Sequence, residues 1–305
     1  GISMSIVDLH MHTFFSTDGE FSPETLIGLC SQANLRLIAV TDHNCVRGIA
    51  PAMEAAKLAG IRLIPGTELD CILDGIYLHL LGYGIDWTDR RFKELEEDVL
   101  AQERKKSGRM LEFAHRELGL QFNDEVCLEL AHDGIITGEI IGETALSDSR
   151  NLENPILTPY QAGGNRSDNP FVNFYWDYFS QGTPGFIPTH YISFHEANQL
   201  ILETGGFSVL AHPAITVGRD EARIRQMAEA GMRGMEVYSS YHSPEDLEYF
   251  GGLADRIGLL KTIGSDFHGK TKPAVRLGFR DGDFGQDGLY RLLSQEFFPG
   301  EPAEP

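Results

Sequence analysis

The chain has 305 residues, which is enough for one large α/β domain or for such a domain with a small insert. Its formal net charge of -20 and its lack of clustered lysine and arginine argue against binding of long nucleic acids, which requires cations that displace counterions. No apolar run is long enough to cross a membrane, and the 4 cysteines form no Cys-x-x-Cys pair, so we expect a soluble, cytoplasmic protein.

The first part of the chain, residues 1–84, alternates short apolar runs with helical segments. Helices are predicted at Pro23–Gln32, with Ser22 as the N-cap, and at Gly48–Ala59, closed by Gly60. This repetition of strand and helix favours a parallel sheet with helices outside it. The predicted strands are Ser5–Leu9, Arg36–Thr41, Ile61–Gly66 and Ile76–Tyr83.

The rhythm of strands and helices breaks near residue 85. A long charged helix is predicted at Thr88–Leu118, and a turn-rich stretch follows from 120 to 199. This region is predicted to be an insert, residues 85–196. Its aromatic cluster has two interpretations, the insert's own core or its seam, and a wall for a substrate base or sugar ring. The cluster consists of Phe171, Phe174, Tyr175, Trp176, Tyr178 and Phe179.

The rhythm resumes with a helix at Glu196–Glu203. Three further strands complete a predicted set of seven parallel strands, and two helices lie between them. A proline- and glutamate-rich tail, residues 299–305, is predicted to be disordered. The strands are Gly206–Ala211, Gly234–Tyr238 and Leu260–Ser265, and the helices are Glu221–Ala230 and Pro244–Ile257.

Side chains that bind metals gather at or just past the ends of these apolar runs. Alternate residues of a strand share a face, so His10 and His12 can bind one ion together. The carboxyl ends of parallel strands carry the chemistry of α/β barrels, which predicts a site for several metals. Mixed imidazole and carboxylate ligands suit Mn, Fe or Zn. The residues so placed are His10, His12, Asp18, His43, Glu68, His79, His212, Asp266 and His268.

These residues stand in motifs that resemble those of the PHP (polymerase and histidinol phosphatase) superfamily of metal-dependent phosphoesterases. The resemblance implies a distorted (β/α)7 TIM-like barrel, residues 1–84 and 197–298, with an inserted, mainly helical cap domain, residues 85–196. It also implies two or three divalent ions. The motifs are Asp8-x-His10-x-His12 with Ser16-x-Asp18-Gly19, Thr41-Asp42-His43, Gly66-Thr67-Glu68, His79, Ala211-His212-Pro213 and Gly264-Ser265-Asp266-Phe267-His268-Gly269.

The resemblance also implies how the ligands divide among the ions. The first ion would be held by His10, His12, Glu68 and Asp266. Glu68 would bridge to a second ion with His79 and His212. A third ion would be held by Asp18, His43 and His268.

Three carboxylates near the ligands are assigned less directly. We expect Asp8 and Asp42 to orient histidines. Glu236 ends a predicted strand, where it could orient a ligand, contact substrate or be a surface acid; we include it among the substrate-binding candidates.

Such a site predicts hydrolysis of small phosphate esters: a nucleotide, a cyclic phosphate or a sugar phosphate. A hydroxide that bridges two ions would attack phosphorus, and the ions would stabilise the charge of the transition state. Asp266 and His242 are candidates for protonating the leaving group, and with Glu68 and His212 they form the predicted catalytic set. Two alternatives are a 5′-3′ exonuclease on short RNA or DNA ends and a non-catalytic metal-binding module.

The position of the insert resembles that in the subgroup of these phosphoesterases that acts on nucleotides and sugar phosphates. There an Arg-Pro-His stretch commonly starts an insert helix, whereas this chain reads Ile136-Thr137-Gly138-Glu139. Another cation should therefore hold a phosphate of the substrate. The candidates are Lys270, Arg166 and Arg150.

Overall fold

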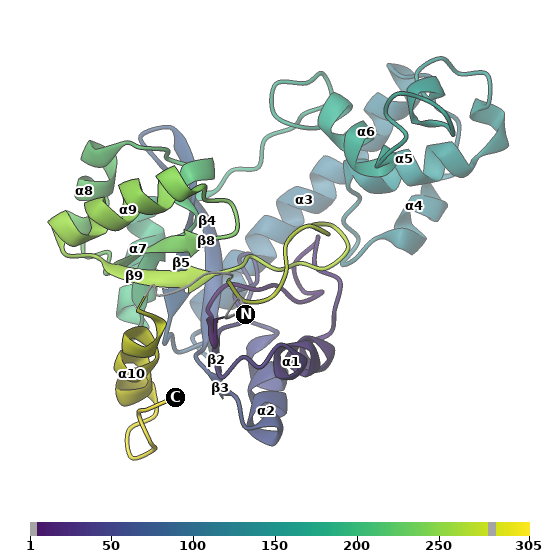
Figure 1. The fold of residues 1–305 in the computed structure, drawn as a ribbon. Coiled ribbons are helices and arrows are strands. Elements are labelled where there is room, and N and C mark those ends of the chain that lie inside the picture. The colour runs from purple at the N-terminus through teal and green to yellow at the C-terminus, as the bar shows by residue number, and fades with distance from the viewer. Residues whose placement is uncertain (1–4, 280–284) are drawn as a thin grey trace. The chain divides into compact units, whose positions relative to one another are not determined.

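The computed structural model describes residues 5–279 and 285–305 of the chain (Figure 1). The chain divides into two compact units. The first is formed by the residues up to 96 and from 191 onward, and the second by residues 97–190. The predicted insert had its boundaries at 85 and 196 instead, and residues 1–4 and 280–284 of the predicted barrel lie outside the described part. None of the helices in the described ranges combines the length and apolar character that a membrane span needs.

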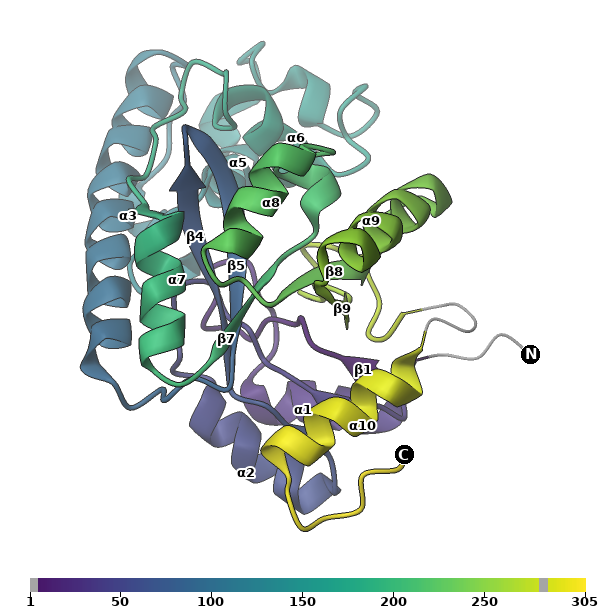
Figure 2. The ribbon, with the colours of Figure 1, turned by 90° about the vertical axis from the view of Figure 1, so that its left-hand side faces the viewer.

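A small parallel sheet in the first unit carries the earliest strands, in the order β1-β2-β3. Helices α1 and α2 pack against each other next to it (Figure 2). The α1 helix begins as predicted, since Ser22 accepts a hydrogen bond from the Thr25 amide, and α2 ends at Gly60 with φ 70°. These elements are β1 (Val7–Asp8), α1 (Pro23–Gln32), β2 (Leu37–Ile38), α2 (Ile49–Ala59) and β3 (Arg62–Leu63).

The second sheet has six strands in the order β6-β4-β5-β7-β8-β9. Strand β5 runs antiparallel to both β4 and β7, while the other pairs are parallel. Helix α7 contacts β4, β5 and β7, and α9 contacts β8 and β9. The elements are β4 (Gly66–Leu73), β5 (Ile76–Tyr83), β6 (Ile192–Ser193), α7 (Phe194–Glu203), β7 (Phe207–Leu210), η3 (Pro213–Ile215), α8 (Glu221–Glu229), β8 (Gly234–Ser239), α9 (Pro244–Ile257) and β9 (Leu260–Gly264).

The hairpin formed by β4 and β5 was not predicted. Its turn, Asp74-Gly75, has φ angles of 49° and 80°. An Asp-Gly pair between two hydrophobic runs is a strong hairpin signal, because both residues accept positive φ at small cost. Since side chains alternate along a strand and Asp70 pairs with His79, the hairpin turns Glu68, Asp70 and His79 to one face.

The α/β class is confirmed, but the predicted set of seven parallel strands is wrong because β5 is antiparallel. A closed barrel is not shown, since the ladders of the described residues form two separate sheets. The sheets approach each other at two places. The Leu9 amide donates to the Ile263 carbonyl at 2.9 Å, and the Glu68 amide donates to the Asp42 carbonyl at 3.0 Å. These contacts bring the ends of strands from both sheets together.

Apolar side chains fill the space between the larger sheet and its helices. Leu80, Ile201, Val237 and Phe250 are fully buried in one cluster. Burying each such side chain contributes about 1.5–3 kcal/mol. This core holds the strands, and therefore the strand ends, in fixed positions.

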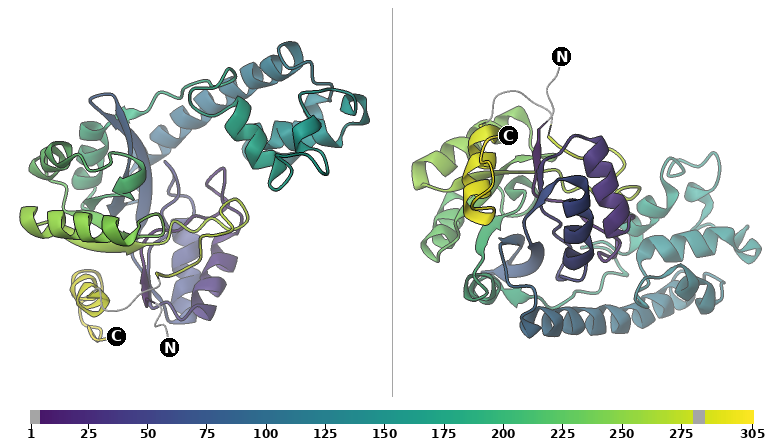
Figure 3. Two further views of the ribbon diagram at one scale, coloured as in Figure 1. Left: turned by 45° about the horizontal axis from the view of Figure 1, so that its top comes forward. Right: turned by 90° about the horizontal axis from the view of Figure 1, so that it is seen from below.

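Helix α10 (Gln286–Phe297) is the yellow helix near the C-terminus in Figure 3. Its Leu289 and Leu293 belong to the same buried cluster as Val7 of β1 and Leu37 of β2. The tail, residues 299–305, contains no helix or strand. Its Glu304 carboxylate accepts from the Arg291 guanidinium at 2.7 Å. The disorder expected for this tail stays a prediction.

The second unit is helical. Phe174 and Phe179 are buried in its core, where Gly142 and Gly138 leave room for their rings, whereas Trp176 is 57% exposed. The first interpretation of the aromatic cluster, a core of the insert itself, is thus correct for the two buried phenylalanines. The elements are α3 (Arg90–Arg116), which begins in the first unit, α4 (Asp124–Leu130), α5 (Gly138–Ser147), η1 (Ser149–Asn151), η2 (Thr158–Tyr160) and α6 (Pro170–Tyr178).

Candidate metal centre

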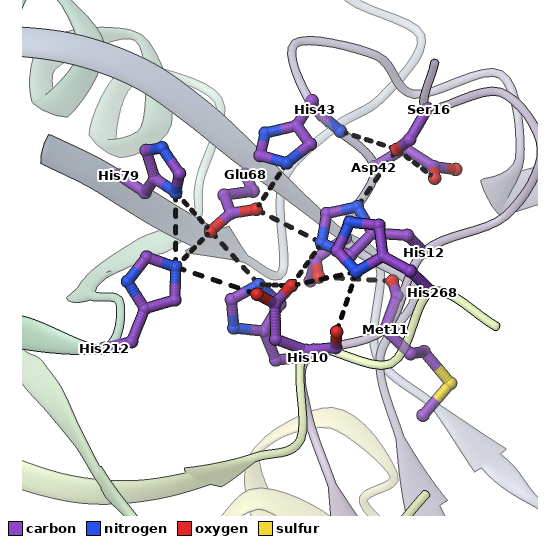
Figure 4. Close-up of polar contacts among 12 residues, drawn as sticks. His10, Met11, His12, Ser16, Asp42, His43, Glu68, His79, His212 and His268 are labelled. Carbon is purple, nitrogen blue, oxygen red and sulfur yellow. Dashed lines mark hydrogen bonds and ion pairs between the residues drawn. The ribbon is translucent and has the colours of Figure 1, made fainter. Parts of the chain in front are cut away.

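Four buried side chains from both sheets meet at one point, and three of them, His10, His12 and Glu68, are labelled in Figure 4. His10 and His12 follow β1, Glu68 lies near the start of β4, and Asp266 follows β9. The Nε2 atom of His10 lies 3.1 Å from Glu68 Oε2 and 3.1 Å from Asp266 Oδ1. The Nε2 atom of His12 lies 3.2 Å from Glu68 Oε1 and 2.9 Å from Asp266 Oδ1. Two imidazoles and two carboxylates therefore surround one point, as the sequence predicted for a first ion.

Glu68 takes part in a second group. Its Oε2 atom lies 3.1 Å from His79 Nδ1 and 3.3 Å from His212 Nε2, and these two nitrogens are 3.2 Å apart. One carboxylate thus faces two sets of imidazoles. This is the arrangement that a bridging ligand between two cations requires.

A third group differs from its prediction. The ligand atoms of His12, His43 and His268 lie within 4.8 Å of one another. Asp18, which was expected here, has its Oδ1 atom 3.3 Å from His268 Nε2 and a half-exposed side chain. The structure adds His12 to this group and leaves Asp18 at its solvent side.

The chemistry of these residues fits divalent cations. Of the buried atoms that make no hydrogen bond in the described part of the chain, five face the cluster. A buried polar atom without a partner costs about 1–3 kcal/mol, and a cation would satisfy several at once. The atoms are Nε2 of His10, His12 and His268, Oε1 of Glu68 and Oδ1 of Asp266.

The other ring nitrogen is engaged in His10, His268 and His79, which orients each ring toward the cluster. His10 Nδ1 donates to Glu236 Oε2 at 2.8 Å. His268 Nδ1 donates to the Asp266 carbonyl at 2.7 Å. His79 Nε2 lies 3.0 Å from Asp70 Oδ1. Such outer acceptors fix the ring orientation and strengthen a metal ligand.

A relay of hydrogen bonds does the same for His12. Its Nδ1 atom is 3.0 Å from the Ser16 hydroxyl, which donates to Asp42 Oδ1 at 2.7 Å. Asp42 therefore orients a histidine through Ser16, in line with its prediction. Asp8 instead accepts from backbone amides, those of His10 at 3.2 Å and Ser265 at 3.0 Å, and so fixes the loops rather than an imidazole.

Mutual attraction sets the charges of the cluster. Burial alone would raise the pKa of Glu68, but His10, His43 and His79 hold it well below its usual range. Burial alone would also raise the pKa of Asp266, and His10 again outweighs it. An ionised carboxylate has no proton to give, which argues against Asp266 as the donor to the leaving group near neutral pH, and its catalytic role stays a prediction.

The histidines respond in the opposite direction. Burial lowers the pKa of His43, but the charges of Glu68 and Asp70 raise it to about 10. The same balance raises the pKa of His79 to about 9. Without cations, these imidazoles carry the compensating positive charge, and a bound metal would take their place.

The backbone is held in uncommon conformations at two of the ligands. His212 has φ 22° and Asp266 has φ 63°. Strain of this kind persists only where the surroundings enforce it and is typical of functional sites. At Gly264 no side chain is tolerated, since an added Cβ would lie 2.2 Å from Glu236 Oε2 and 2.4 Å from His10 Cβ.

Two predicted roles near the cluster need correction. Glu236 is fully buried, with Oε2 bonded to His10 and Oε1 accepting from the His212 amide at 3.1 Å, so it orients ligands and does not face substrate. His242 uses both ring nitrogens for backbone hydrogen bonds: its Nδ1 donates to the Val237 carbonyl at 2.7 Å, and its Nε2 accepts from the Ala214 amide at 3.3 Å. Both nitrogens of His242 serve the backbone, which leaves none for proton transfer.

The three predicted substrate cations are not brought to the cluster by any observed contact. In the described part of the chain the Lys270 ammonium makes no hydrogen bond or ion pair, although its amide donates to Glu20 at 3.0 Å. Arg166 pairs with Asp177 at 2.8 Å, within the second unit. Arg150 pairs in the same way with its neighbour Asp148, at 2.7 Å. Their roles in binding substrate stay predictions.

The sequence analysis missed four residues whose side chains bond the side chains of predicted ligands. Asp70 faces His79, and the Tyr77 hydroxyl bonds both of them; the Asp-Gly turn was the signal that could have revealed this face. Lys272 and Tyr241 both bond Asp266 Oδ2, at 3.0 Å and 2.5 Å. No sequence signal distinguished Lys272 from Lys270.

The chain is similar to known proteins along most of its length. The model of the PHP domain family matches residues 8–147. The 3′,5′-nucleoside bisphosphate phosphatase of Chromobacterium violaceum is 30% identical over 282 residues, which cover 87% of this chain and 88% of that protein. The 5′-3′ exoribonuclease Rnm of Escherichia coli is 27% identical over 296 residues, covering 95% and 94%.

A solved structure agrees with these matches. An amidohydrolase from Chromobacterium violaceum, with sulfate bound, has a TM-score of 0.73 and 26% identity, and the similarity covers 91% of this chain and 92% of that one. The matches with relatives span both segments that carry the predicted ligands. The chain therefore belongs to the PHP domain family.

Proposed function

We propose that this protein is a metal-dependent hydrolase of small phosphate esters, such as a nucleotide, a cyclic phosphate or a sugar phosphate. One observation carries the proposal: buried ligand atoms without hydrogen bonds converge in adjoining groups that share Glu68. The relative from Chromobacterium violaceum is a phosphatase of nucleoside bisphosphates, and a related structure binds sulfate, a tetrahedral oxyanion like phosphate. Both support a phosphate ester as the substrate.

The cofactors we propose are two or three divalent ions. His10, His12, Glu68 and Asp266 would hold the first, and Glu68 would bridge to a second. His79 and His212 would complete that second set. Asp18, His43 and His268, joined by His12, would hold a third. Mn, Fe and Zn all accept such mixed ligands.

The chain's own residues prepare the reaction. Ions bound there would polarise the phosphoryl oxygens and activate water. Glu236 keeps the Nδ1 proton of His10, so that Nε2 presents its lone pair to the cluster. Ser16 does the same for His12. Because these groups are buried and fixed before substrate binds, little reorganisation is needed during the reaction.

The finer features of the fold belong to this proposal as well. We propose that the two sheets act as a distorted barrel, supported by the contacts of Leu9 with Ile263 and of Asp42 with Glu68. The role of the second unit as a cap stays a prediction. The location of the protein in the cytoplasm stays a prediction as well.

A phosphate-release screen of the Mn-loaded protein tests the function. The panel includes nucleoside monophosphates and bisphosphates, cyclic phosphates and sugar phosphates. His212→Ala and Asp266→Asn are the site variants, and circular dichroism checks that they fold. Release from one class of small ester, lost in both variants together with bound metal, is the expected result. Silence across the panel would contradict the proposal and favour a non-catalytic metal-binding module.

A second candidate is a 5′-3′ exonuclease on short RNA or DNA ends, because the Escherichia coli relative is an exoribonuclease and matches 95% of the chain. The net charge of -20 argues against it. Short oligonucleotides in the same screen distinguish the two. Cleavage of oligonucleotides that weakens steeply with salt, without hydrolysis of small esters, would make the exonuclease the better assignment.

A further inference from the structure

Lys272 lies at the metal centre and has a donor to spare. Its Nζ atom donates to Asp266 Oδ2 at 3.0 Å and to the Tyr241 hydroxyl at 2.7 Å. An ammonium group has three N–H donors, and within the described residues these are its two acceptors, so one N–H is left over. The side chain is 32% exposed. A ligand that arrives from solvent can therefore reach this donor.

Asp266 divides its two oxygens between the candidate metal ligands and this lysine. Its Oδ1 atom faces His10 and His12, at 3.1 Å and 2.9 Å, whereas Oδ2 accepts from Tyr241 and Lys272. The ammonium is thus one carboxylate away from the point where the first ion would bind.

Tyr241 fixes the lysine in place. Its ring meets the His212 ring edge to face, with centroids 5.5 Å apart, and Lys272 Nζ lies 5.2 Å from the centre of the same tyrosine ring. The tyrosine follows β8 and the lysine follows β9, so neighbouring strands deliver the pair to one end of the sheet. A lysine held by a hydroxyl, a carboxylate and a ring loses less entropy when it binds a ligand.

The negative charge of the buried carboxylates favours a cation such as Lys272 beside the cluster. Glu68, Glu236 and Asp266 are buried together, and the chain as a whole carries a net charge of -20. A phosphate ester is itself anionic and is repelled by these carboxylates wherever bound ions do not neutralise them. A fixed ammonium at the solvent side offsets this repulsion.

We propose that Lys272, positioned by Tyr241, binds a phosphoryl oxygen of the substrate beside the metal centre. The inference rests on the proposed function and deepens it, because it names the residue that holds the reacting phosphate. Lysine is a common point-charge ligand of phosphate. It replaces Lys270, the lysine favoured by sequence alone, which has no contact with a candidate ligand in the described residues.

A purely structural lysine would behave differently. If Lys272 only held Asp266 in the orientation of a metal ligand, its loss would weaken metal binding. If it binds phosphate, its loss weakens anion binding even when the metal sites are saturated. Phosphate affinity and metal affinity, measured separately, therefore distinguish the two roles.

The experiment is calorimetric titration of inorganic phosphate into the Mn-saturated protein, with steady-state kinetics on the best ester of the screen. The variants are Lys272→Met and Lys272→Arg. The matched control is Lys261→Met: the Lys261 side chain is 34% exposed and its ammonium lies 3.0 Å from Asp255, but it stands near the start of β9, at the opposite end of that strand.

Lys272→Met is expected to weaken phosphate binding by about 10-fold to 100-fold, the range for one lost charge-assisted hydrogen bond. It should raise KM more than it lowers kcat, with Mn affinity close to that of the wild type. Lys272→Arg should recover most of the binding, and Lys261→Met should match the wild type.

Unchanged phosphate affinity in Lys272→Met, or a loss of Mn affinity that accounts for the whole effect, would overturn the inference. A wild-type protein that binds no phosphate when Mn-saturated would overturn it as well. Failure of the proposed function looks different, because the wild type would then hydrolyse no ester in the screen. If the wild type hydrolyses an ester and Lys272→Met binds phosphate as tightly as the wild type, only the role of Lys272 is wrong.

Discussion

Replacing Glu236 by glutamine removes one negative charge from behind the metal centre while keeping the size of the side chain. Glu236 is fully buried, and its two oxygens accept from His10 Nδ1 at 2.8 Å and from the His212 amide at 3.1 Å. Glutamine offers one acceptor oxygen and one NH2 group, so it can keep only one of these bonds.

The size of the effect follows from these contacts. A hydrogen bond to a charged group contributes about 1.5–3 kcal/mol. The bond to His10 makes Nε2 a better ligand, so most of the loss should appear in metal affinity. Because each factor of ten corresponds to about 1.4 kcal/mol, we expect Glu236→Gln to bind Mn about 10-fold to 100-fold more weakly.

Competition of the protein with a fluorescent chelator for Mn measures this affinity directly. Asn198→Ala is the control, because Asn198 is also buried and uses both ends of its amide, toward the Ser208 hydroxyl at 2.6 Å and the Ala230 carbonyl at 2.9 Å. The control should lower thermal stability without changing Mn affinity. Wild-type Mn affinity in a folded Glu236→Gln protein would refute the role assigned to Glu236.

Three further predictions follow. Gly264→Ala should lower the free energy of unfolding by about 1–3 kcal/mol, measured by urea denaturation, because its methyl group would lie 2.2 Å from a buried carboxylate oxygen. Gly28→Ala is the control and should not lower it, because the added methyl group on α1 meets no atom. Mn binding at pH 7.5 should release protons and strengthen as pH rises, because His43 and His79, with pKa values raised to about 10 and 9, must lose their protons to bind metal. Calorimetry in buffers of different ionisation enthalpy measures the protons released. An absence of proton release would contradict the prediction. Phe174→Ala should destabilise the second unit by about 3–5 kcal/mol, seen as faster hydrogen exchange in α5; unchanged exchange would contradict the assigned core.

Local signals predicted much of the first unit. The α1 helix begins where a serine N-cap and a proline stand together, and α2 ends at a glycine with positive φ. Both signals act within one turn of helix, so they do not depend on the rest of the fold. The same is true of His10 and His12, whose spacing on an extended chain places both on one face.

The direction of β5 could not be read from its own apolar run. A short apolar run fits a parallel or an antiparallel strand equally well, and only its hydrogen-bond partners decide between them. The Asp-Gly turn was a local signal for the hairpin, and using it would have placed Asp70 beside His79. The wrong direction hid Asp70, although it left the position of His79 as a candidate ligand unaffected.

The sequence by itself determined which residues are able to hold metal, because ligand chemistry and motif spacing are properties of short segments. The tertiary structure decided what each neighbour of those ligands does. Glu236 lies within strand β8 and His242 follows it closely, yet one faces His10 and the other bonds backbone groups. Lys272 rather than Lys270 reaches Asp266. Such choices depend on how loops distant in sequence pack against one another, and the energies of those contacts are not written in any one segment.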